Sequence, residues 1–353
     1  MQYDFLAIGD TTVDAFIKIS DAWIETDNPK REQELCMRFA EKVPYESLTE
    51  IPAVGNSANA AVCAARLGLA AGLVSNIGAD DNGKKCLDTL KKENLGVEYI
   101  KAHTGAKTNY HFVLWYGAER TILVKHELYP YALPNIEPPR WLYLSSIGGG
   151  TEKYHEEIAA WLAKNPSVKF ASQPGTFQIS LGTKKLRALY ERADVFVCNR
   201  EEAQKITSSV SLRETPPSRE EFTDSLLEEG AERSEAGDVK NLLNSLRALG
   251  PKIVCITDGP NGAYMADSSG EYFMSIYPDP KPPYERTGAG DAFASTFVSY
   301  LALGKTPFEA LRLAPINSAY VVQGIGAQRG LLSREKLEEY LKNAPREYEP
   351  RRL

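Results

Sequence analysis

Short runs of apolar residues alternate along this chain with longer amphipathic segments. The apolar runs predict buried strands at Phe5–Gly9, Leu73–Ile77, Trp141–Ser145, Val168–Ala171, Val195–Cys198 and Ile253–Thr257. The amphipathic segments predict helices at Ala58–Leu67, Gly83–Lys92, Tyr154–Ala163, Lys184–Arg192, Val239–Leu249, Ala289–Leu303, Pro307–Gln323 and Ser333–Lys342. Strands that alternate with helices are typical of βα units around a mostly parallel sheet. The pattern therefore predicts an α/β fold, as one domain over residues 1–353.

Two stretches break this rhythm, because apolar and polar residues alternate with a period of two in residues 111–115 and 121–124. Such alternation is typical of half-exposed antiparallel strands. We predict that residues 15–50 and 97–127 form a small second sheet that acts as a lid; edge hairpins of the main sheet are the alternative. Residues 208–238 are rich in Glu and Ser and contain Pro216 and Pro217, which predicts a solvated, partly disordered acidic insertion.

Composition and charge narrow the class of protein. The chain has 47 acidic and 41 basic residues and a net charge of −6, which argues against a nucleic-acid binder that relies on a basic face. No apolar run reaches the roughly 18 to 20 residues of a membrane span, and no basic segment precedes the first strand, so we expect neither a membrane anchor nor a signal peptide. The five cysteines are scattered without a C-x-x-C motif, which predicts reduced packing thiols in a cytoplasmic protein.

The strongest local motif is the sequence Arg-Thr-Gly-Ala-Gly-Asp at residues 286–291, directly before a helical run. Gly288 and Gly290 allow backbone N–H groups to point at one spot, and the helix adds its positive end there, which favours an anion. Asp291 would then lie in the first helical turn, where it is placed to accept a proton from an attacking hydroxyl. An acidic residue that only stabilises the start of a helix is the alternative.

A second motif joins small residues to two amides at the start of another predicted helix. Gly55 is followed by Asn56 and Asn59, whose side chains offer both donors and acceptors and so suit the hydroxyls of a polyol. A plain N-cap with small packing residues is the alternative.

Further candidate residues lie at the ends of three predicted strands, at the edge where open α/β sheets bind ligands. They are Asp10 and Asp14, Asn199 and Glu202 in the spacing N-x-x-E, and Thr257 and Gly259. Each set alone is compatible with turn chemistry. Their shared position at strand ends is what indicates a site.

Taken in order, these motifs resemble those of the ribokinase, or PfkB, family of carbohydrate and nucleoside kinases, over nearly the whole chain. The resemblance implies a ribokinase-like, Rossmann-type α/β/α three-layer domain with a small β-sheet lid. It further implies phosphorylation of a hydroxymethyl group at the expense of ATP, and a homodimer joined through the lid. We therefore expect an ATP-dependent kinase for a primary hydroxyl of a small sugar or sugar derivative. A nucleoside kinase on the same fold, or a silent sugar-binding homologue, are the alternatives.

The resemblance also implies roles for individual residues. Asp291 matches the general base, and the anion hole for the γ-phosphate matches Gly288, Ala289 and Gly290. The acceptor's hydroxyls would be held by Asp14, Gly55, Asn56 and Asn59. The nucleotide side would be formed by Asn199, Glu202, Thr257, Gly259 and Asn317, with Glu202 organising Mg²⁺ through water.

The chain departs from the family pattern at three positions near the site. Glu285 and Arg286 replace the Asp-Thr pair that commonly precedes the glycine motif. The resemblance implies that Glu285 and Thr287 bind a monovalent cation such as K⁺ beside the anion hole. Gln173 follows the mid-sheet strand where many sugar kinases present an acid, which weakens an assignment to ribose.

Overall fold

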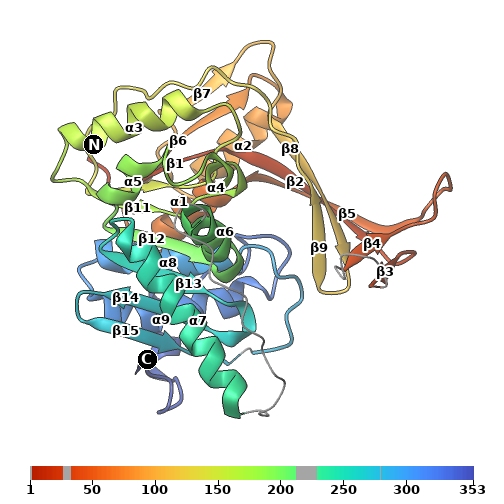
Figure 1. Ribbon diagram of the computed structural model, residues 1–353. Coiled ribbons are helices and arrows are strands. Elements are labelled where there is room, and N and C mark those ends of the chain that lie inside the picture. The colour runs from red at the N-terminus through yellow and green to blue at the C-terminus, as the bar shows by residue number, and fades with distance from the viewer. Residues whose placement is uncertain (1, 27–32, 212–228, 279) are drawn as a thin grey trace.

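A computed structural model describes residues 2–26, 33–211, 229–278 and 280–353. Its main sheet has ten strands in the order β16-β15-β14-β13-β12-β11-β10-β1-β6-β7 (Figure 1). These are β1 Phe5–Ile8, β6 Ala71–Gly78, β7 Ile100–His103, β10 Trp141–Leu144, β11 Lys169–Ser172, β12 Val195–Asn199, β13 Ile253–Thr257, β14 Ala263–Asp267, β15 Gly270–Met274 and β16 Arg351–Arg352. The strands from β13 to β7 pair in parallel, and the predicted α/β sheet is confirmed.

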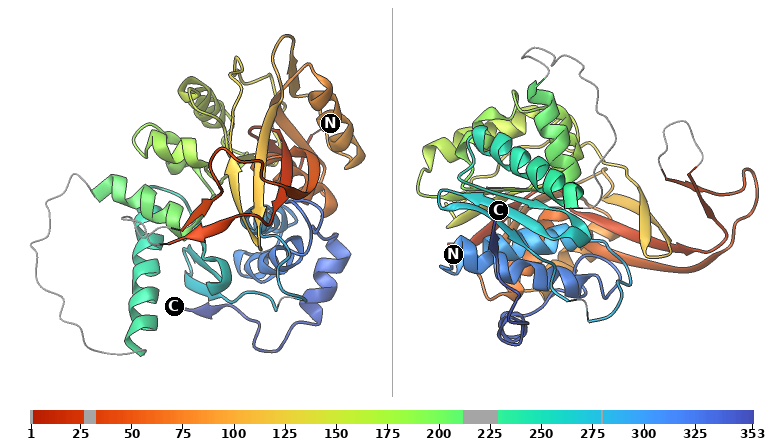
Figure 2. Two further views of the ribbon diagram at one scale, coloured as in Figure 1. Left: turned by 90° about the vertical axis from the view of Figure 1, so that its right-hand side faces the viewer. Right: turned by 60° about the horizontal axis from the view of Figure 1, so that its bottom comes forward.

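Helices cover both faces of this sheet and complete three layers (Figure 2). One face is covered by α1 Asn56–Arg66, α2 Asp81–Lys92, α8 Ala289–Ala302, α9 Pro307–Val321 and α10 Arg334–Lys342. The other is covered by α3 Glu152–Lys164, α4 Thr176–Leu181, α5 Arg187–Arg192, α6 Arg200–Ser211 and α7 Glu229–Ala248. Strand β1 shows why both are needed, because its successive residues Phe5 and Leu6 are fully buried in different core clusters.

A second sheet projects from one side of the layered body (Figure 1). Its four strands, in the order β5-β2-β8-β9, are β5 Tyr45–Val54, β2 Thr12–Ile19, β8 Asn109–Tyr116 and β9 Glu119–Leu123. The short strands β3 Trp23–Glu25 and β4 Glu34–Cys36 pair with each other near its far end. One part of the lid prediction is wrong: residues 100–103 form β7 and pair with β6 in the main sheet, which extends the parallel core by one strand.

Other differences from the sequence prediction lie at the sheet edge and around the acidic insertion. The hairpin of β14 and β15 follows a short 3₁₀ helix, η1 Gly259–Asn261, and was not predicted. Helices α6 and α7 extend into both ends of the stretch predicted as an insertion, and α7 begins ten residues before the predicted helix. The middle of that stretch, residues 212–228, lies outside the described residues.

The five cysteines are all free, and four of them are buried in the core. Among the described residues, no helix is both long and apolar enough to cross a membrane.

Candidate active site

The carboxyl ends of the parallel strands place the candidate residues along one edge of the main sheet. Asp10 follows β1, Gln173 follows β11, and Asn199 ends β12. The second sheet begins at the same edge, since β2 starts two residues after Asp10 and carries Asp14. Ligands of open α/β sheets bind at this edge, so the topology brings together residues far apart in the sequence.

The two glycines at the start of α8 have different surroundings. Gly288 is the N-cap, with a positive φ of 85°, and a Cβ on it would lie 2.4 Å from the Cβ of Ala327. Gly290 lies in the first turn of the helix, and a Cβ there would meet no atom within 4 Å. The start of α8 is therefore open at position 290, which borders a cavity. Such a helix start favours an anion.

Asp291 is held from two sides by amide side chains. Asn59 Nδ2 donates a hydrogen bond of 2.8 Å to one carboxylate oxygen, and Gln173 Nε2 donates one of 3.0 Å to the other. Each amide is itself fixed, because the Oδ1 of Asn59 accepts from Gln328 Nε2 at 2.9 Å, and the Oε1 of Gln173 accepts from the hydroxyl of Tyr143. A network that spans β10, β11, α1 and α8 thus orients one carboxylate.

The surroundings of Asp291 raise its pKa above the ordinary value for an aspartate. Burial is the main cause, because desolvation disfavours the charged carboxylate, and the charge of Asp14 acts in the same direction. The hydrogen bonds from Asn59 and Gln173 and the charge of Arg120 oppose this shift, because they stabilise the ionised form. Asp291 is therefore more basic than an exposed aspartate, as suits a group that takes up a proton.

Beside this network lies an acid–histidine cluster, formed by Asp10, Asp14, His111 and His126. Asp14 Oδ1 lies 3.4 Å from His111 Nδ1, and Asp10 Oδ2 lies 3.2 Å from His126 Nδ1. Asp10 also accepts hydrogen bonds from the Tyr131 hydroxyl at 2.7 Å and from the backbone N–H of Gly148 at 2.8 Å. The two histidine rings meet edge to face with 5.5 Å between their centres.

Three buried side-chain atoms of this cluster form no hydrogen bond within the described structure: Asp14 Oδ1, His111 Nε2 and His126 Nδ1. Two of them, Asp14 Oδ1 and His126 Nδ1, lie at ion-pair distance from the neighbouring histidine or acid without the geometry of a hydrogen bond. Buried polar groups are almost always hydrogen-bonded, so these atoms have hydrogen-bonding capacity that the described residues do not use. Gly55 allows helix α1 to begin close to Asp10. Its φ is 110°, and a Cβ on it would lie 2.6 Å from the carbonyl oxygen of Asp10. Asn56 is half-buried at the start of the same helix.

A cavity of about 410 Å³ lies against the start of α8. The predicted residues that line it are Asn199, Thr257, Gly259, Ala289 and Gly290. The cavity continues over Pro315 and Ser318, whereas Asn317 turns away from it. Asn317 is fully buried, donates to Thr296 Oγ1 at 2.8 Å and accepts from the backbone N–H of Leu332 at 2.9 Å. The assignment of Asn317 to the nucleotide side is therefore corrected, because this residue holds α8 and α9 together.

The N-x-x-E pair forms a reciprocal cap at the start of α6. Asn199 Oδ1 accepts from the backbone N–H of Glu202 at 2.8 Å, and Glu202 Oε2 accepts from the backbone N–H of Asn199 at 2.9 Å. The pair also lines a hollow of about 500 Å³ that adjoins the first cavity at Asn199. Burial raises the pKa of Glu202, so a nearby cation would stabilise its carboxylate.

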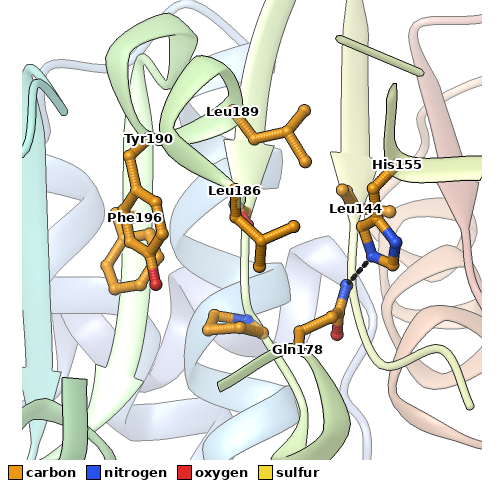
Figure 3. A pocket seen from close by; sticks show the side chains of 9 residues that line it. Leu144, His155, Gln178, Leu186, Leu189, Tyr190 and Phe196 are labelled. Atoms are coloured by element: carbon orange, nitrogen blue, oxygen red, sulfur yellow. Dashed lines mark hydrogen bonds between the residues drawn. The ribbon is translucent and has the colours of Figure 1, made fainter. Parts of the chain in front are cut away.

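A much smaller hollow is lined by residues of α4, α5 and the neighbouring strands (Figure 3). It has room for about 10 Å³, close to the size of one water molecule. Gln178 Nε2 contacts His155 Nε2 at 3.1 Å and donates to the Ser145 carbonyl at 3.0 Å, and its Oε1 accepts from Gly175 N–H at 2.8 Å. These bonds fix the loop that follows β11 and carries Gln173.

Comparison with known proteins places this arrangement in a family. Arabidopsis thaliana ribokinase complexed with ribose and ATP matches with a TM-score of 0.73 at 18% identity, over 97% of this chain and 99% of that one. The nucleoside kinase of Methanocaldococcus jannaschii matches with a TM-score of 0.70 at 14% identity, over 96% and 98%. The fold is therefore ribokinase-like, as predicted. In sequence, the family model of the pfkB family carbohydrate kinases matches residues 28–334.

Curated relatives agree with the family model. The chain is 27% identical over 314 residues to the ribokinase of Bacillus subtilis, covering 86% of this chain and 92% of the relative. It is 26% identical over 284 residues to the ATP-dependent 6-phosphofructokinase of Thermoanaerobacterium thermosaccharolyticum, covering 77% and 80%. The chain belongs to the pfkB family of carbohydrate kinases. The sequence prediction of a carbohydrate kinase is confirmed at that level.

Sequence reasoning missed several residues that the fold brings to the site. Gln173 was noted only as a departure from related sugar kinases, although it donates directly to Asp291. His111, His126 and Arg120 were not singled out, because each lies on or beside the second sheet. The only sequence signal for them was their position in or next to a period-two segment.

Proposed function

We propose that this kinase transfers the γ-phosphoryl group of ATP to a primary hydroxyl of a small sugar or sugar derivative, with Asp291 as the general base. The observation that supports this most strongly is the position of Asp291. It lies in the first turn of α8, close enough to Asp14 to feel the charge of that carboxylate, and the neighbouring Ala289 and Gly290 line the 410 Å³ cavity. An acceptor hydroxyl held beside Asp14 and a phosphate chain from the 410 Å³ cavity would therefore meet at this helix start.

The catalytic step we propose needs little covalent chemistry from the protein. Asp291 accepts the proton of the acceptor hydroxyl as its oxygen attacks phosphorus, and the ADP oxygen leaves on the opposite side. Backbone N–H groups at Gly288, Ala289 and Gly290 stabilise the charge of the transferring group. Asn59 and Gln173 hold the carboxylate so that little reorganisation is needed when the proton moves.

The nucleotide would lie in the cavity lined by Asn199, Thr257 and Gly259. Glu202 fits a role in holding Mg²⁺ through water, since its side chain lines the adjoining hollow. Magnesium commonly retains several waters and phosphate ligands, so one carboxylate is sufficient. When bound, the ion would neutralise part of the phosphate charge.

The acceptor is proposed to be a neutral polyol because atoms of the acid–histidine cluster have no hydrogen-bond partner in the described structure. Asp14 Oδ1 and His111 Nε2 need a donor or an acceptor from a ligand, and adjacent sugar hydroxyls supply both. A nucleoside would also need a flat apolar slot for its base. Phe112 and Trp115 point to opposite faces of β8, and Trp115 is buried against Tyr284 with ring centres 5.1 Å apart, so they form no such slot together.

A panel of acceptors with ATP and Mg²⁺ tests this proposal, with ADP release as the measurement. We expect at least one free pentose or hexose to be phosphorylated with a kcat/KM well above that of adenosine, guanosine and cytidine. A preference of roughly a hundredfold for any nucleoside, about 2.7 kcal/mol, would favour the nucleoside-kinase alternative. Sugar binding by calorimetry without turnover of any acceptor would favour the silent homologue.

The second sheet is proposed to act as a lid and, on its outer face, to join two copies of the chain. Its inner face carries Asp14 and His111 at adjacent register positions. Its outer face leaves apolar side chains exposed, including Phe112 at 45%, Leu123 at 52% and Leu48 at 52%. Phe112 and Leu123 are paired across β8 and β9, so they form one continuous patch.

Sedimentation equilibrium tests this interface. We expect a species of twice the chain mass for the wild type and a monomer for Phe112→Asp, because a charge would be buried in the apolar patch. Leu128→Asp is the matched control: Leu128 is more exposed than Phe112 but lies outside the four strands. A wild-type monomer, or a Phe112→Asp dimer, would contradict this arrangement.

A further inference from the structure

The carboxylate of Glu285, just ahead of the glycine turn, is fully buried. Its Oε1 accepts hydrogen bonds from the backbone N–H and the hydroxyl of Thr287, at 2.8 and 2.5 Å. Its Oε2 accepts from the backbone N–H of Gly326 at 3.2 Å. All three donors are neutral. Burying an ionised carboxylate costs folding free energy unless a positive charge lies beside it. Glu285 therefore needs a countercharge.

The structure provides the charge from the second sheet. Arg120 lies on β9, and its Nε is 3.8 Å from Glu285 Oε1, the one ion pair of Glu285 among the described residues. That Nε is buried and donates no hydrogen bond within the described structure. The Arg120 side chain also lines the 410 Å³ cavity with Ala289 and Gly290. The guanidinium therefore lies between the buried carboxylate and the proposed anion hole.

A monovalent cation does not fit beside this arrangement. Glu285 Oε1 already accepts two hydrogen bonds, and the guanidinium lies on the same oxygen. Arg286 adds a second positive charge next in sequence, held by Glu119 at 3.3 Å. A potassium ion at Glu285 and Thr287 would be repelled by both guanidinium groups. The structure thus disagrees with the cation site that the family resemblance implied.

We propose that Arg120 permanently supplies the positive charge beside the anion hole, in place of a potassium ion, and delivers it from the second sheet. Arg120 is a positioning residue in this proposal: it compensates Glu285, which fixes Thr287 and so the turn at Gly288. Because Arg120 lies on β9, its positive charge lies beside the anion hole only while the second sheet is packed against the main sheet domain. The expected effect of Arg120 on catalysis rests on the proposed kinase function, whereas its compensation of the Glu285 charge does not.

The first measurement is the potassium response of the wild-type protein. Activity and thermal melting are compared in potassium chloride and in choline chloride at equal ionic strength, so that general screening is the same. We expect kcat to differ by less than about twofold and the melting temperature to be the same in both salts. Activation by potassium of roughly tenfold or more would overturn the proposal.

The second measurement uses Arg120→Ala, which leaves Glu285 buried without its countercharge. We expect kcat to fall about tenfold or more in choline, with potassium restoring part of the loss and raising the melting temperature of this variant alone. Arg120→Lys should retain most activity without potassium, because an ammonium group keeps the charge. Lys125→Ala is the matched control, since it removes a positive charge just after β9 that pairs only with Glu127 in the described structure.

The melting experiment separates the two proposals, because it needs neither ATP nor an acceptor. If no acceptor is phosphorylated by the wild type, a potassium-specific stabilisation of Arg120→Ala still supports the charge replacement. If Arg120→Ala does not fold, the double variant Arg120→Ala/Glu285→Gln should fold, because the uncompensated charge is gone. Arg120→Ala with wild-type activity and no potassium response would overturn the proposal, as would a double variant no more stable than the single one.

Discussion

Replacing Asp291 with Asn should lower kcat by about a hundredfold or more while leaving ATP binding nearly unchanged. The amide has the size of the carboxylate but cannot take up the proton of the acceptor. Folding should persist, because the loss of one accepted hydrogen bond is offset in part by removal of a buried charge. Steady-state kinetics, calorimetric titration with ATP and thermal melting would measure the three effects separately.

Asp81→Asn is a matched control, because Asp81 also lies in the first turn of a helix but is exposed and outside the site. It should leave kcat unchanged.

The pH dependence gives an independent check: Asn59→Ala removes a hydrogen bond that stabilises ionised Asp291, so the pKa of Asp291 rises further. The acid limb of the kcat profile should therefore move to higher pH. Near wild-type turnover in Asp291→Asn would remove this residue from the mechanism.

Gly290→Ala should lower kcat/KM by about a hundredfold or more, because a phosphoryl group displaced from the backbone N–H groups would lose their stabilisation. The added methyl group would enter the open space in front of the helix start, where the transferring phosphoryl group is proposed to lie. Stability should be unchanged or higher by up to about 1 kcal/mol, since alanine is a better helix former than glycine. Activity and chemical denaturation would be measured on the same preparation.

Gly288→Ala provides the contrasting outcome. Its φ of 85° and its 2.4 Å approach to Ala327 mean that a side chain there would strain the turn, so this variant should lose stability as well as activity. A Gly290→Ala variant that loses activity only in proportion to its loss of stability would argue against an anion hole at this helix start.

The main sheet could be predicted because most of its parallel strands are buried on both faces. β1, β6 and β10 are buried at every position, which gives continuous apolar runs in the sequence. The edge hairpin could not be predicted in the same way, since most of β15 is only half-buried. Strand β7 has two exposed residues of four, and only its pairing partner assigns it to the main sheet rather than the second one.

The candidate site was predictable where one segment carries both the residue and its local geometry. The glycine turn and Asp291 are of this kind, because a helix start defines them. Gln173 and Arg120 are not, because their contacts with Asp291 and Glu285 depend on how separate strands pack. Asn317 was wrongly assigned because a two-residue step along a helix changes the face, and only the packing of α8 on α9 decides which face meets the cavity.

The long separation of the residues around Asp291 has a consequence for synthesis on the ribosome. Asn59 and Gln173 precede Asp291 by 232 and 118 residues. At roughly 5 to 20 residues per second, Asn59 is made about 10 to 50 s before the carboxylate that it binds. During that interval the core side of β1 and α1 lacks its cover from α8 and α9. The nascent chain thus presents an apolar sheet face to chaperones well before it can transfer a phosphoryl group.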